Sequence, residues 1–341
     1  MKENNLSLSD FITLMLPAIE MELERALIPL QATELAELRQ MFAYHLGWEG
    51  EGAGAAARGK RIRPMIVLLT TAAAGGNWEQ ALPAAAAVEL VHNFSLIHDD
   101  IEDNSALRRG RPTVWKKWGI AQAINAGDAM FTLAHLSILR LENTPPEAVL
   151  HAAQLLQETC LHLTQGQFLD ISYETTGGLS LDSYWTMVRG KTAALLSACS
   201  ELGALVAGAP PSQRESYREF GQALGLAFQA QDDLLGIWGD SALMGKSAES
   251  DLLEGKKSLP VLYGLSQKAD FAKRWEVGQI LEKDVPALAA QLKTEGAYEF
   301  TQAAVQKWTD QALQALEQAQ PQGDAGLALY TLAEKLLSRQ S

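Results

Sequence analysis

Two pairs of adjacent aspartates are the residues in this sequence whose types and spacing most clearly indicate chemistry. Asp99-Asp100 and Asp232-Asp233 lie in segments that read as helices, and Asp103 follows the first pair by one turn. Because Asp99 and Asp103 are four residues apart, their carboxylates would lie on one face of a helix, close enough to share cations. So much negative charge within apolar helices needs compensation, which divalent cations carrying a phosphorylated substrate would provide. The pattern predicts magnesium and a diphosphate.

The second pair lies on a polar stripe of an otherwise apolar helix. Gln229, Asp232 and Asp233 occupy positions i, i+3 and i+4 in FQAQDDLLGIWGD. Burying these carboxylates without compensation would be costly, which favours an opposing face that carries metal. We therefore expect the two acidic helices to face each other across a cavity. The plainer interpretation, two acidic helix ends at the solvated surface with ion pairs worth about 0–1 kcal/mol, stays open.

Basic side chains accompany both acidic pairs. GKRIRP places Lys60, Arg61 and Arg63 at the start of a helix, where free backbone N–H groups and the helix dipole favour anions. The other basic candidates are Arg108, Arg109 and Arg111 directly after the first acidic pair, and Lys191, Lys246, Lys256 and Lys257 later in the chain. Guanidinium groups suit phosphate oxygens because they can donate two parallel hydrogen bonds. Each cluster alone is more often a solvated cationic patch, and only the combination with two acidic pairs favours anion binding.

The composition excludes several classes of function. A net charge of −13 over 341 residues argues against nucleic acid as the main partner, since a phosphate backbone needs a basic surface. The two cysteines, Cys160 and Cys199, lie in helical stretches and indicate neither a disulfide framework nor a metal cluster. The N-terminus lacks the basic start and apolar block of a signal peptide, and no apolar run of about 20 residues could span a bilayer. We expect no membrane span and a cytoplasmic location.

The elements that must position these residues read as helices almost throughout, because apolar residues recur at steps of three and four. No linker divides the chain, so we expect an all-α fold in a single domain, residues 1–341: a bundle of roughly ten or more helices around a central cavity. The expected helices run from Ser9 or Asp10 to about Tyr44, from Ile62, from Pro83 through the first acidic pair, from Lys117 to Leu141, Glu147 to Tyr173, Ser180 to Val206, Gln213 to Ile237 and Leu259 to Gln267, with several more in the last part of the chain. GWEGEGAGAAARG and RRGRPT are expected to be loops.

Six motifs follow one another between Arg58 and Leu265. They are GKRIRP, LVHNFSLIHDD, DDIED with its RRGRPT tail, RGKTAALLSACSELGA, FQAQDDLLGIWGD and GK…DLLEGKKSLP. In this order they resemble the trans-isoprenyl diphosphate synthases, also called polyprenyl synthetases. The resemblance implies the all-α isoprenoid synthase fold, usually as a homodimer. It also implies magnesium-dependent condensation of isopentenyl diphosphate with an allylic diphosphate, which is dimethylallyl, geranyl or farnesyl diphosphate.

The resemblance further implies roles for individual side chains. The metal ligands, for three magnesium ions per active site, would be Asp99, Asp103 and Asp232, with Gln229 and Asp233 beside them. The allylic diphosphate would contact Lys191 and Lys246, assisted by Arg108 and Lys256, and isopentenyl diphosphate would contact Lys60, Arg63, His92 and Arg109. Cations and basic groups would stabilise the departing diphosphate, and the isopentenyl double bond would attack the allylic carbocation that remains. A dry cavity would protect this cation, supported by the Thr192 hydroxyl and the Gln229 amide.

Two positions qualify this expectation. Position 236 is glycine where many relatives have a third aspartate in the second box, and we expect a changed water network with activity retained, because Asp232 is the residue expected to bind metal. Phe94 lies five residues before Asp99, about 7.5 Å down the helix at ~1.5 Å per residue. An aromatic residue there resembles short-chain enzymes, commonly those that make geranylgeranyl diphosphate.

Alternatives remain for several of these assignments. Phe94 would lie about 140° around the helix from Asp99, so simple core packing is open, and Met130 or Phe131 could form the cavity floor instead. Without the resemblance, His92 would be read as a satisfied core histidine. A terpene cyclase would not need the basic residues expected to bind isopentenyl diphosphate, and a non-catalytic partner subunit would be expected to lose one acidic pair. Both sets are present, which favours the synthase, with a farnesyl or longer product as the alternative to geranylgeranyl.

Overall fold

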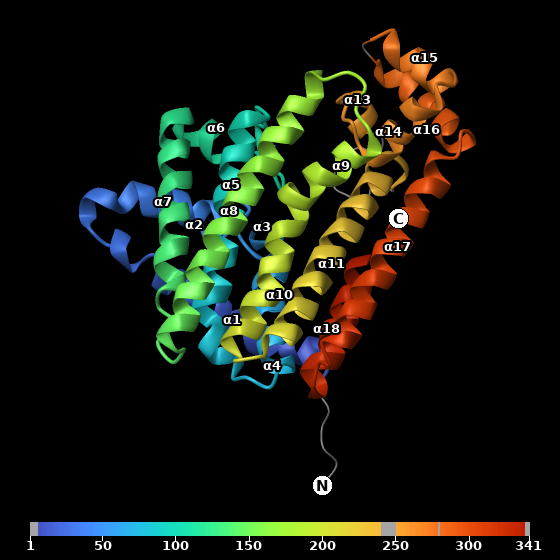
Figure 1. The fold of residues 1–341 in the computed structure, drawn as a ribbon. Coiled ribbons are helices and arrows are strands. Elements are labelled where there is room, and N and C mark those ends of the chain that lie inside the picture. The colour runs from blue at the N-terminus through green and yellow to red at the C-terminus, as the bar shows by residue number, and fades with distance from the viewer. Residues whose placement is uncertain (1–5, 240–249, 279, 338–341) are drawn as a thin grey trace. The chain divides into compact units, whose positions relative to one another are not determined.

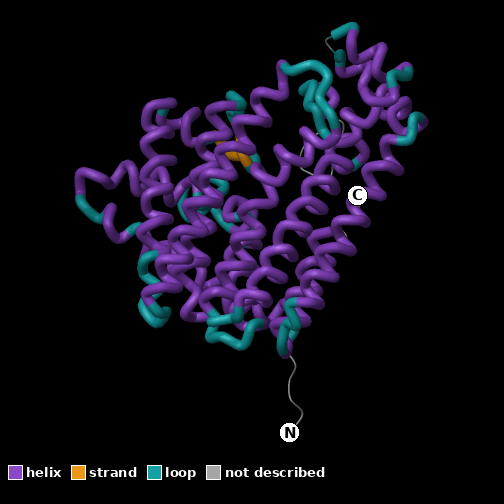
Figure 2. Tube along the Cα trace, in the orientation of Figure 1, coloured by secondary structure: helices purple, strands orange, loops and turns teal. Residues whose placement is uncertain are grey.

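The computed structural model describes residues 6–239, 250–278 and 280–337. Helices make up most of these ranges, and the only strands in them are β1 (Leu107–Arg108) and β2 (Arg111–Pro112), which pair as an antiparallel hairpin (Figure 2). The all-α class expected from the sequence is therefore confirmed. Within the same ranges, no helix has a stretch long and apolar enough to cross a bilayer.

The chain forms two compact units, each built from three separate stretches of sequence. The first unit comprises Met1–Cys160, Ala198–Glu215 and Gln320–Leu329, and the second comprises Leu161–Ser197, Ser216–Ala319 and Tyr330–Ser341. In the first unit, a backbone hydrogen bond attaches the last stretch to the first, because the Gln322 N–H donates to the Ala73 carbonyl at 2.7 Å.

The N-terminal helix starts earlier and ends earlier than the sequence predicts. Helix α1 (Leu8–Ala26) begins at a capping box, in which the Ser7 N–H donates to the Asp10 carboxylate (2.8 Å) and the Ser7 hydroxyl accepts from the Asp10 N–H (3.3 Å). The prediction of a single helix to about Tyr44 is wrong, because Pro29 lacks the N–H that a continuing helix requires. Two 3₁₀ turns and a second helix follow: η1 (Ile28–Leu30), η2 (Thr33–Leu35) and α2 (Ala36–His45).

The next elements of the first unit include the helix that carries the first acidic pair, α5 (Leu82–Glu102; Figure 1). In chain order they are α3 (Ala55–Arg58), α4 (Ile62–Ala73), η3 (Trp78–Ala81), α5 (Leu82–Glu102), the β1–β2 hairpin, α6 (Val114–Trp118), α7 (Ile120–Ile138) and α8 (Pro146–Thr175), which continues into the second unit. Helix α5 has Pro83 in its first turn, as predicted, and contacts α1, α4 and α7. Its four alanines at positions 84–87 are fully buried, and their small side chains permit this close packing.

The rest of the chain is also helical. It continues with α9 (Leu181–Val188), the π-helical segment η4 (Arg189–Ala193), α10 (Ala194–Val206), α11 (Pro211–Trp238), α13 (Ser250–Leu253), α14 (Leu259–Gln267), α15 (Asp270–Glu276), η5 (Glu282–Asp284), α16 (Val285–Thr294), α17 (Ala297–Gln318) and α18 (Gly323–Leu337). One hydrophobic cluster of the second unit packs around Tyr184, Leu226 and Leu259, which joins α9, α11 and α14. This cluster lies beside the second acidic pair.

Most predicted helices agree with the structure, and two differ for local reasons. The predicted helix from Lys117 to Leu141 is split into α6 and α7 at Gly119, which has a φ of +86°. The predicted helix from Ser180 to Val206 contains the π-helical segment η4, a local widening that is frequent at functional sites. The glycine-rich loop predicted before Lys60 contains the short helix α3.

Candidate active site

The first acidic pair lies at the C-terminal end of α5. Asp99 is in the last turn, and Asp103 caps the helix by donating its N–H to the Asp99 carbonyl at 2.8 Å. Asp103 is exposed and Asp99 is half-buried, whereas Asp100 is buried. The four-residue spacing thus places Asp99 and Asp103 on successive turns of the helix, as predicted.

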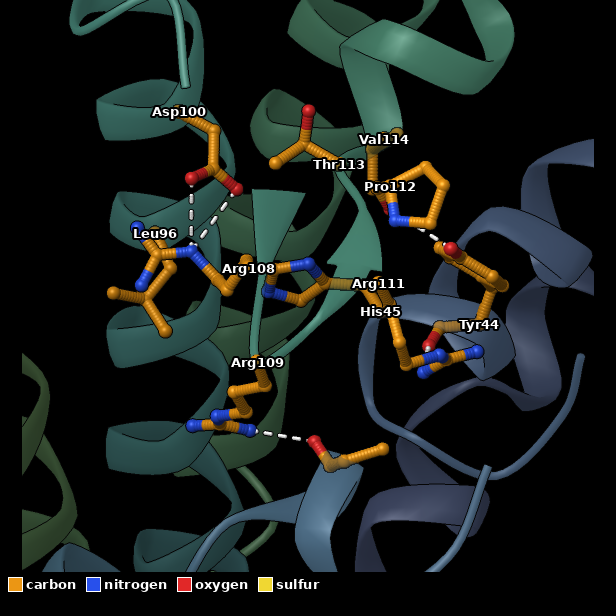
Figure 3. Close-up of a pocket in the computed structure, with 11 residues that line it drawn as sticks. Tyr44, His45, Leu96, Asp100, Arg108, Arg109, Arg111, Pro112, Thr113 and Val114 are labelled. Atoms are coloured by element: carbon orange, nitrogen blue, oxygen red, sulfur yellow. Dashed lines mark hydrogen bonds and ion pairs between the residues drawn. The ribbon is translucent and has the colours of Figure 1, made fainter. Parts of the chain in front are cut away.

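Asp100 has a structural role, because it binds Arg108 of the adjacent hairpin. The Arg108 Nε donates to both of its carboxylate oxygens, at 2.9 and 3.0 Å, as Figure 3 shows. Burial raises the pKa of Asp100 to about 6, although the Arg108 guanidinium opposes this shift. Arg108 therefore reaches the acidic end of α5 in a fixed position, where its remaining N–H groups can serve an anion.

The β1–β2 hairpin turns at Arg109 and Gly110, with φ of +52° and +74°. Two consecutive positive φ values are typical of the tight turns that join hairpin strands, and arginine is an unusual residue for the first position. The Arg109 guanidinium donates to the Ala57 carbonyl at 2.6 Å (Figure 3) and packs against Gly59, where a Cβ would lie 2.7 Å from its Nη2. The turn therefore presents Arg109 to the segment that contains Lys60.

Arg111 is used for structure instead. Its guanidinium donates to the backbone carbonyls of Tyr44 (2.8 Å), Glu49 (2.6 Å) and Glu51 (2.9 Å), and it lies over the Tyr44 ring at 4.0 Å. One carbonyl from the last turn of α2 and two from the loop after it thus occupy this side chain. Of the three arginines in RRGRPT, the geometry leaves Arg108 and Arg109 as anion-binding candidates.

Three of the four residues expected to bind isopentenyl diphosphate, Arg63, His92 and Arg109, lie near one another in the first unit. Burial lowers the pKa of His92 well below its usual value, and the charges of Arg63, Arg109 and Arg108 lower it further. His92 is therefore neutral at physiological pH within a cationic cluster. The fourth residue, Lys60, is exposed and follows Gly59, the residue that Arg109 packs against.

His45 belongs to the same cluster but was missed from the sequence, because a lone histidine in a helix carries no recognisable signal. It lines a small cavity of about 20 Å³ together with Asp100, Arg108 and Arg109 (Figure 3). A cavity of this size has room for about one water molecule. Burial, followed by the charges of Arg108 and Arg109, lowers the pKa of His45 to about 3.

This histidine should make stability depend on pH. The unfolded chain protonates His45 near its ordinary pKa of 6.5, whereas the folded protein keeps it neutral to about pH 3, so its contribution is complete above pH 6.5 and is lost as the pH falls. Between pH 7 and pH 5, the unfolding free energy of the wild type should fall by about 2 kcal/mol more than that of His45→Asn. Urea unfolding at both pH values measures this difference, and parallel curves for the two proteins would contradict it.

In the second unit, Asp233 is fixed by three donors. It accepts hydrogen bonds from the Tyr184 hydroxyl (2.7 Å), the Leu259 N–H (2.8 Å) and the Gln229 amide (2.9 Å). Burial raises its pKa, and these three donors oppose the rise. Asp233 thus connects α11 with α9 and with the start of α14. Neither Tyr184 nor Leu259 could be recognised as its partner from spacing.

The other groups of the second acidic box lie around this anchor. The Thr192 hydroxyl donates to the Gln229 carbonyl oxygen at 2.8 Å, which orients the amide that holds Asp233. Asp232, the residue directly before Asp233 on α11, is half-buried. Lys191, in the π-helical segment η4, forms an ion pair with Asp170 of α8, a residue that the sequence reasoning missed. The lack of a side chain at Gly166 lets the backbone of Lys191 approach α8 closely enough for this pair.

The place beside Gly236 is filled by a carboxylate from another helix. A Cβ on Gly236 would lie 2.8 Å from the Asp251 Cγ and 3.2 Å from its Oδ1, with Oδ2 closer still. Lys256 accompanies Asp251, with 3.8 Å between its Nζ and the Asp251 Oδ1. Residue 236 must therefore be small, and α13 supplies a carboxylate where a third aspartate of the box would begin.

Two further lysines of the C-terminal motif complete the comparison with the sequence. Lys257 donates to the carbonyls of Tyr173 (2.6 Å), Glu174 (3.0 Å) and Thr176 (2.6 Å) at the end of α8, so it caps that helix. Lys246 lies outside the described residues.

The arrangement divides the aspartates into two kinds. Asp100 and Asp233 are buried and held by protein donors, while Asp99, Asp103 and Asp232 lie at half-buried or exposed positions. Carboxylate oxygens are the ligands that magnesium prefers, so the second kind fits a metal site. No group of three or more potential ligands forms a complete site within the ranges that the structure describes. That the two acidic helices face each other stays a prediction.

Comparison with known proteins assigns the family. Residues 53–294, more than half of the chain, match the model for polyprenyl synthetases. A (2E,6E)-farnesyl diphosphate synthase of Mycobacterium tuberculosis is 38% identical over 314 residues, and a geranylgeranyl diphosphate synthase of the same organism is 38% identical over 310; each alignment covers 89% of this chain and 87% of the relative. A polyprenyl synthase structure from Caulobacter crescentus, complexed with calcium and isoprenyl diphosphate, covers 100% of both chains with 29% identity and a TM-score of 0.82.

The chain therefore belongs to the polyprenyl synthetase family, as its motifs indicated. Within it, the chain is a short-chain isoprenyl diphosphate synthase, a trans-prenyltransferase. The terpene cyclase alternative is not favoured.

Proposed function

We propose that this enzyme condenses isopentenyl diphosphate with an allylic diphosphate in a magnesium-dependent reaction, and that its main product is geranylgeranyl diphosphate. One observation carries the proposal: in each acidic pair, one aspartate is buried and the other lies at a more exposed position. In the first pair, the buried Asp100 holds Arg108 at the end of α5 that also carries Asp99 and Asp103. Carboxylates and guanidinium groups in one place suit metal ions and diphosphate together.

The residues would divide the work by charge. Asp99, Asp103 and Asp232 would bind three magnesium ions in each active site. These ions would neutralise the diphosphate that leaves the allylic substrate. Lys191, Lys246, Arg108 and Lys256 would bind the same diphosphate, and Lys60, Arg63, His92 and Arg109 would bind isopentenyl diphosphate. Because His92 stays neutral, it would donate a hydrogen bond without adding a charge. Asp233 would hold the Gln229 amide, which also accepts from the Thr192 hydroxyl, and the dipoles of these two groups would favour the allylic cation.

The test is direct. Purified enzyme is incubated with magnesium, isopentenyl diphosphate and one allylic starter at a time, and the products are separated by chain length. We expect dimethylallyl, geranyl or farnesyl diphosphate to be extended to geranylgeranyl diphosphate, with no extension after chelation of magnesium. A cyclic hydrocarbon without elongated diphosphate would refute the proposal.

Product length rests on an aromatic cluster between α5 and α7. The Phe94 ring meets the Phe131 ring edge-on, with centroids 5.0 Å apart, and meets the His98 ring at 5.8 Å. Phe131 also packs on His135 at 4.4 Å, whereas Met130 is fully buried. We propose that Phe94, supported by Phe131, ends the space available to the growing chain.

Replacing Phe94 with alanine should therefore lengthen the product beyond geranylgeranyl diphosphate, because the chain could pass the position of the lost ring. Product analysis by reverse-phase chromatography measures the change. Phe220→Leu, at a fully buried aromatic residue of the second unit, is the control and should keep the product unchanged. An unaltered product in Phe94→Ala would mean that this ring only fills the core.

We also propose that the two units form one polyprenyl synthetase domain, that two copies assemble as a homodimer, and that the enzyme is cytoplasmic. Support for the dimer comes from large apolar side chains exposed along two helices: Ile120, Ile124 and Leu136 on α7 with Leu139 directly after it, and Leu150, Leu161, Phe168 and Ile171 on α8. Exposed apolar surface of this kind is typical of protein interfaces. Sedimentation equilibrium of the wild type and of Phe168→Asp tests the dimer, and a monomeric wild type would refute it.

A further inference from the structure

Arg61 differs from its two basic neighbours in GKRIRP. Its guanidinium is completely buried and donates to Glu20 of α1 (2.8 Å), to Glu89 of α5 (2.7 Å) and to the Leu46 carbonyl after α2 (3.0 Å). Lys60 is exposed and Arg63 is half-buried. One side chain therefore connects three helices from the centre of a segment whose other cations are expected to bind diphosphate.

The two carboxylates that receive Arg61 are themselves held. Glu20 also accepts a hydrogen bond from the Trp48 indole (2.5 Å), and Glu89 accepts one from the Asn93 amide (2.9 Å). The charge of Arg61 is neutralised within this network, so the guanidinium does not compete with Lys60 and Arg63 for an anion. Arg61, Glu20 and Glu89 each have at least two partners, so the network fixes the positions of these three side chains.

The backbone at Arg61 is held in an unfavourable shape. Its φ and ψ are +46° and +40°, a left-handed conformation that crowds the Cβ of any residue other than glycine. This conformation lies at the N-cap of α4, where it turns the chain between Lys60 and Arg63. Strained residues persist only where surrounding contacts hold them, and the Arg61 ion pairs are such contacts.

Stability alone is a poor explanation for this network. Buried ion pairs are frequently no more stabilising than apolar side chains of similar volume, because removing both charges from water is costly. A geometric role fits better: Glu89 lies three residues before His92 on α5, so the Arg61–Glu89 pair fixes the GKRIRP segment beside His92.

We propose that Arg61 is a positioning residue, which sets the distance of Lys60 and Arg63 from His92 and Arg109 and so builds the isopentenyl diphosphate site. The inference rests on the function proposed above. It assigns Arg61 a role that the sequence does not reveal, since in the sequence Arg61 resembles one more surface cation of an anion-binding cluster.

Two glutamates of α1 provide a matched test. Glu20 pairs with Arg61 (2.8 Å), and Glu22 accepts a hydrogen bond from Arg140 (2.6 Å), which lies outside the GKRIRP segment. Both side chains are largely buried, at 14% and 8% exposure. Glu20→Gln should raise KM for isopentenyl diphosphate by roughly 10- to 100-fold, with KM for the allylic diphosphate and kcat within about threefold of the wild type. Glu22→Gln should lower Tm by about as much as Glu20→Gln does, but it should leave both KM values unchanged.

Equal changes in both KM values, or a loss of Tm alone in Glu20→Gln, would overturn the proposal. A second measurement does not require turnover: calorimetric titration with inorganic diphosphate, without magnesium, reports anion binding by the basic residues. Glu20→Gln should bind it about tenfold more weakly than Glu22→Gln, and equal affinities would also overturn the role of Arg61. If the wild type binds diphosphate but forms no prenyl product, the proposed function fails while the positioning role is still tested.

Discussion

Asp99→Asn is expected to lower kcat by about 10²- to 10³-fold, the size of effect seen when one preorganised electrostatic group is removed from an active site. Asparagine has nearly the shape of aspartate but lacks its charge, so a metal ligand would be weakened without a change in packing. Asp99 is half-buried in the last turn of α5, one turn before the exposed Asp103. Steady-state rates at several magnesium concentrations measure the effect, and higher magnesium should recover part of it.

Glu102→Gln is the matched control, because it removes one negative charge from the same turn at an exposed position. Its kcat should stay within about threefold of the wild type, since an exposed charge contributes little. If both variants lost the same activity, the total negative charge near the end of α5 would explain the result, and metal binding by Asp99 would be contradicted.

Gly236→Asp is expected to harm the enzyme, although it restores the third aspartate found in many relatives. The new Cβ would overlap the Asp251 carboxylate, which lies 2.8 Å away at its Cγ, and would add a like charge in a buried place. We expect Tm to fall by on the order of 5 °C and kcat/KM to fall about tenfold or more. Thermal unfolding and steady-state kinetics measure both effects.

Two further variants identify the cause. Asp251→Gly in the Gly236→Asp background should recover stability, because it exchanges the positions of the glycine and the carboxylate. Gly177→Asp, at an exposed glycine with open space around it, should change Tm little. A double variant no more stable than Gly236→Asp alone would exclude Asp251 as the source of the clash.

Periodicity and proline placement predicted much of the fold. The starts of α4 and α5 and both ends of α14 follow from apolar spacing and from Pro83, because these helices lie in regular surroundings. The break after α1 comes at Pro29, which apolar spacing alone does not take into account, and the π-helical segment η4 depends on local backbone geometry, which a pattern of apolar residues does not contain. Sequence reasoning therefore works best where a helix has one buried face and no functional distortion.

The candidate site shows the same division. The placement of Asp99 and Asp103 was predictable because both carboxylates lie at the end of one helix at a fixed spacing. Asp170, Tyr184 and Asp251 were not, since each meets its partner across a long stretch of chain: Asp170 with Lys191, Tyr184 with Asp233 and Asp251 with Gly236. Only the fold shows which charged residues are buried and paired with other protein groups.

The hairpin turn at Arg109 limits how far this enzyme can be stabilised. The backbone at this position has a φ of +52°, which asparagine or glycine would adopt at lower cost, yet the Arg109 guanidinium holds the Ala57 carbonyl and is proposed to bind isopentenyl diphosphate. Selection for heat resistance alone would favour replacing this residue, and the same replacement would remove the guanidinium proposed to bind diphosphate. Thermostable variants should therefore be sought with position 109 held constant, since the backbone conformation and the proposed binding role favour different residues there.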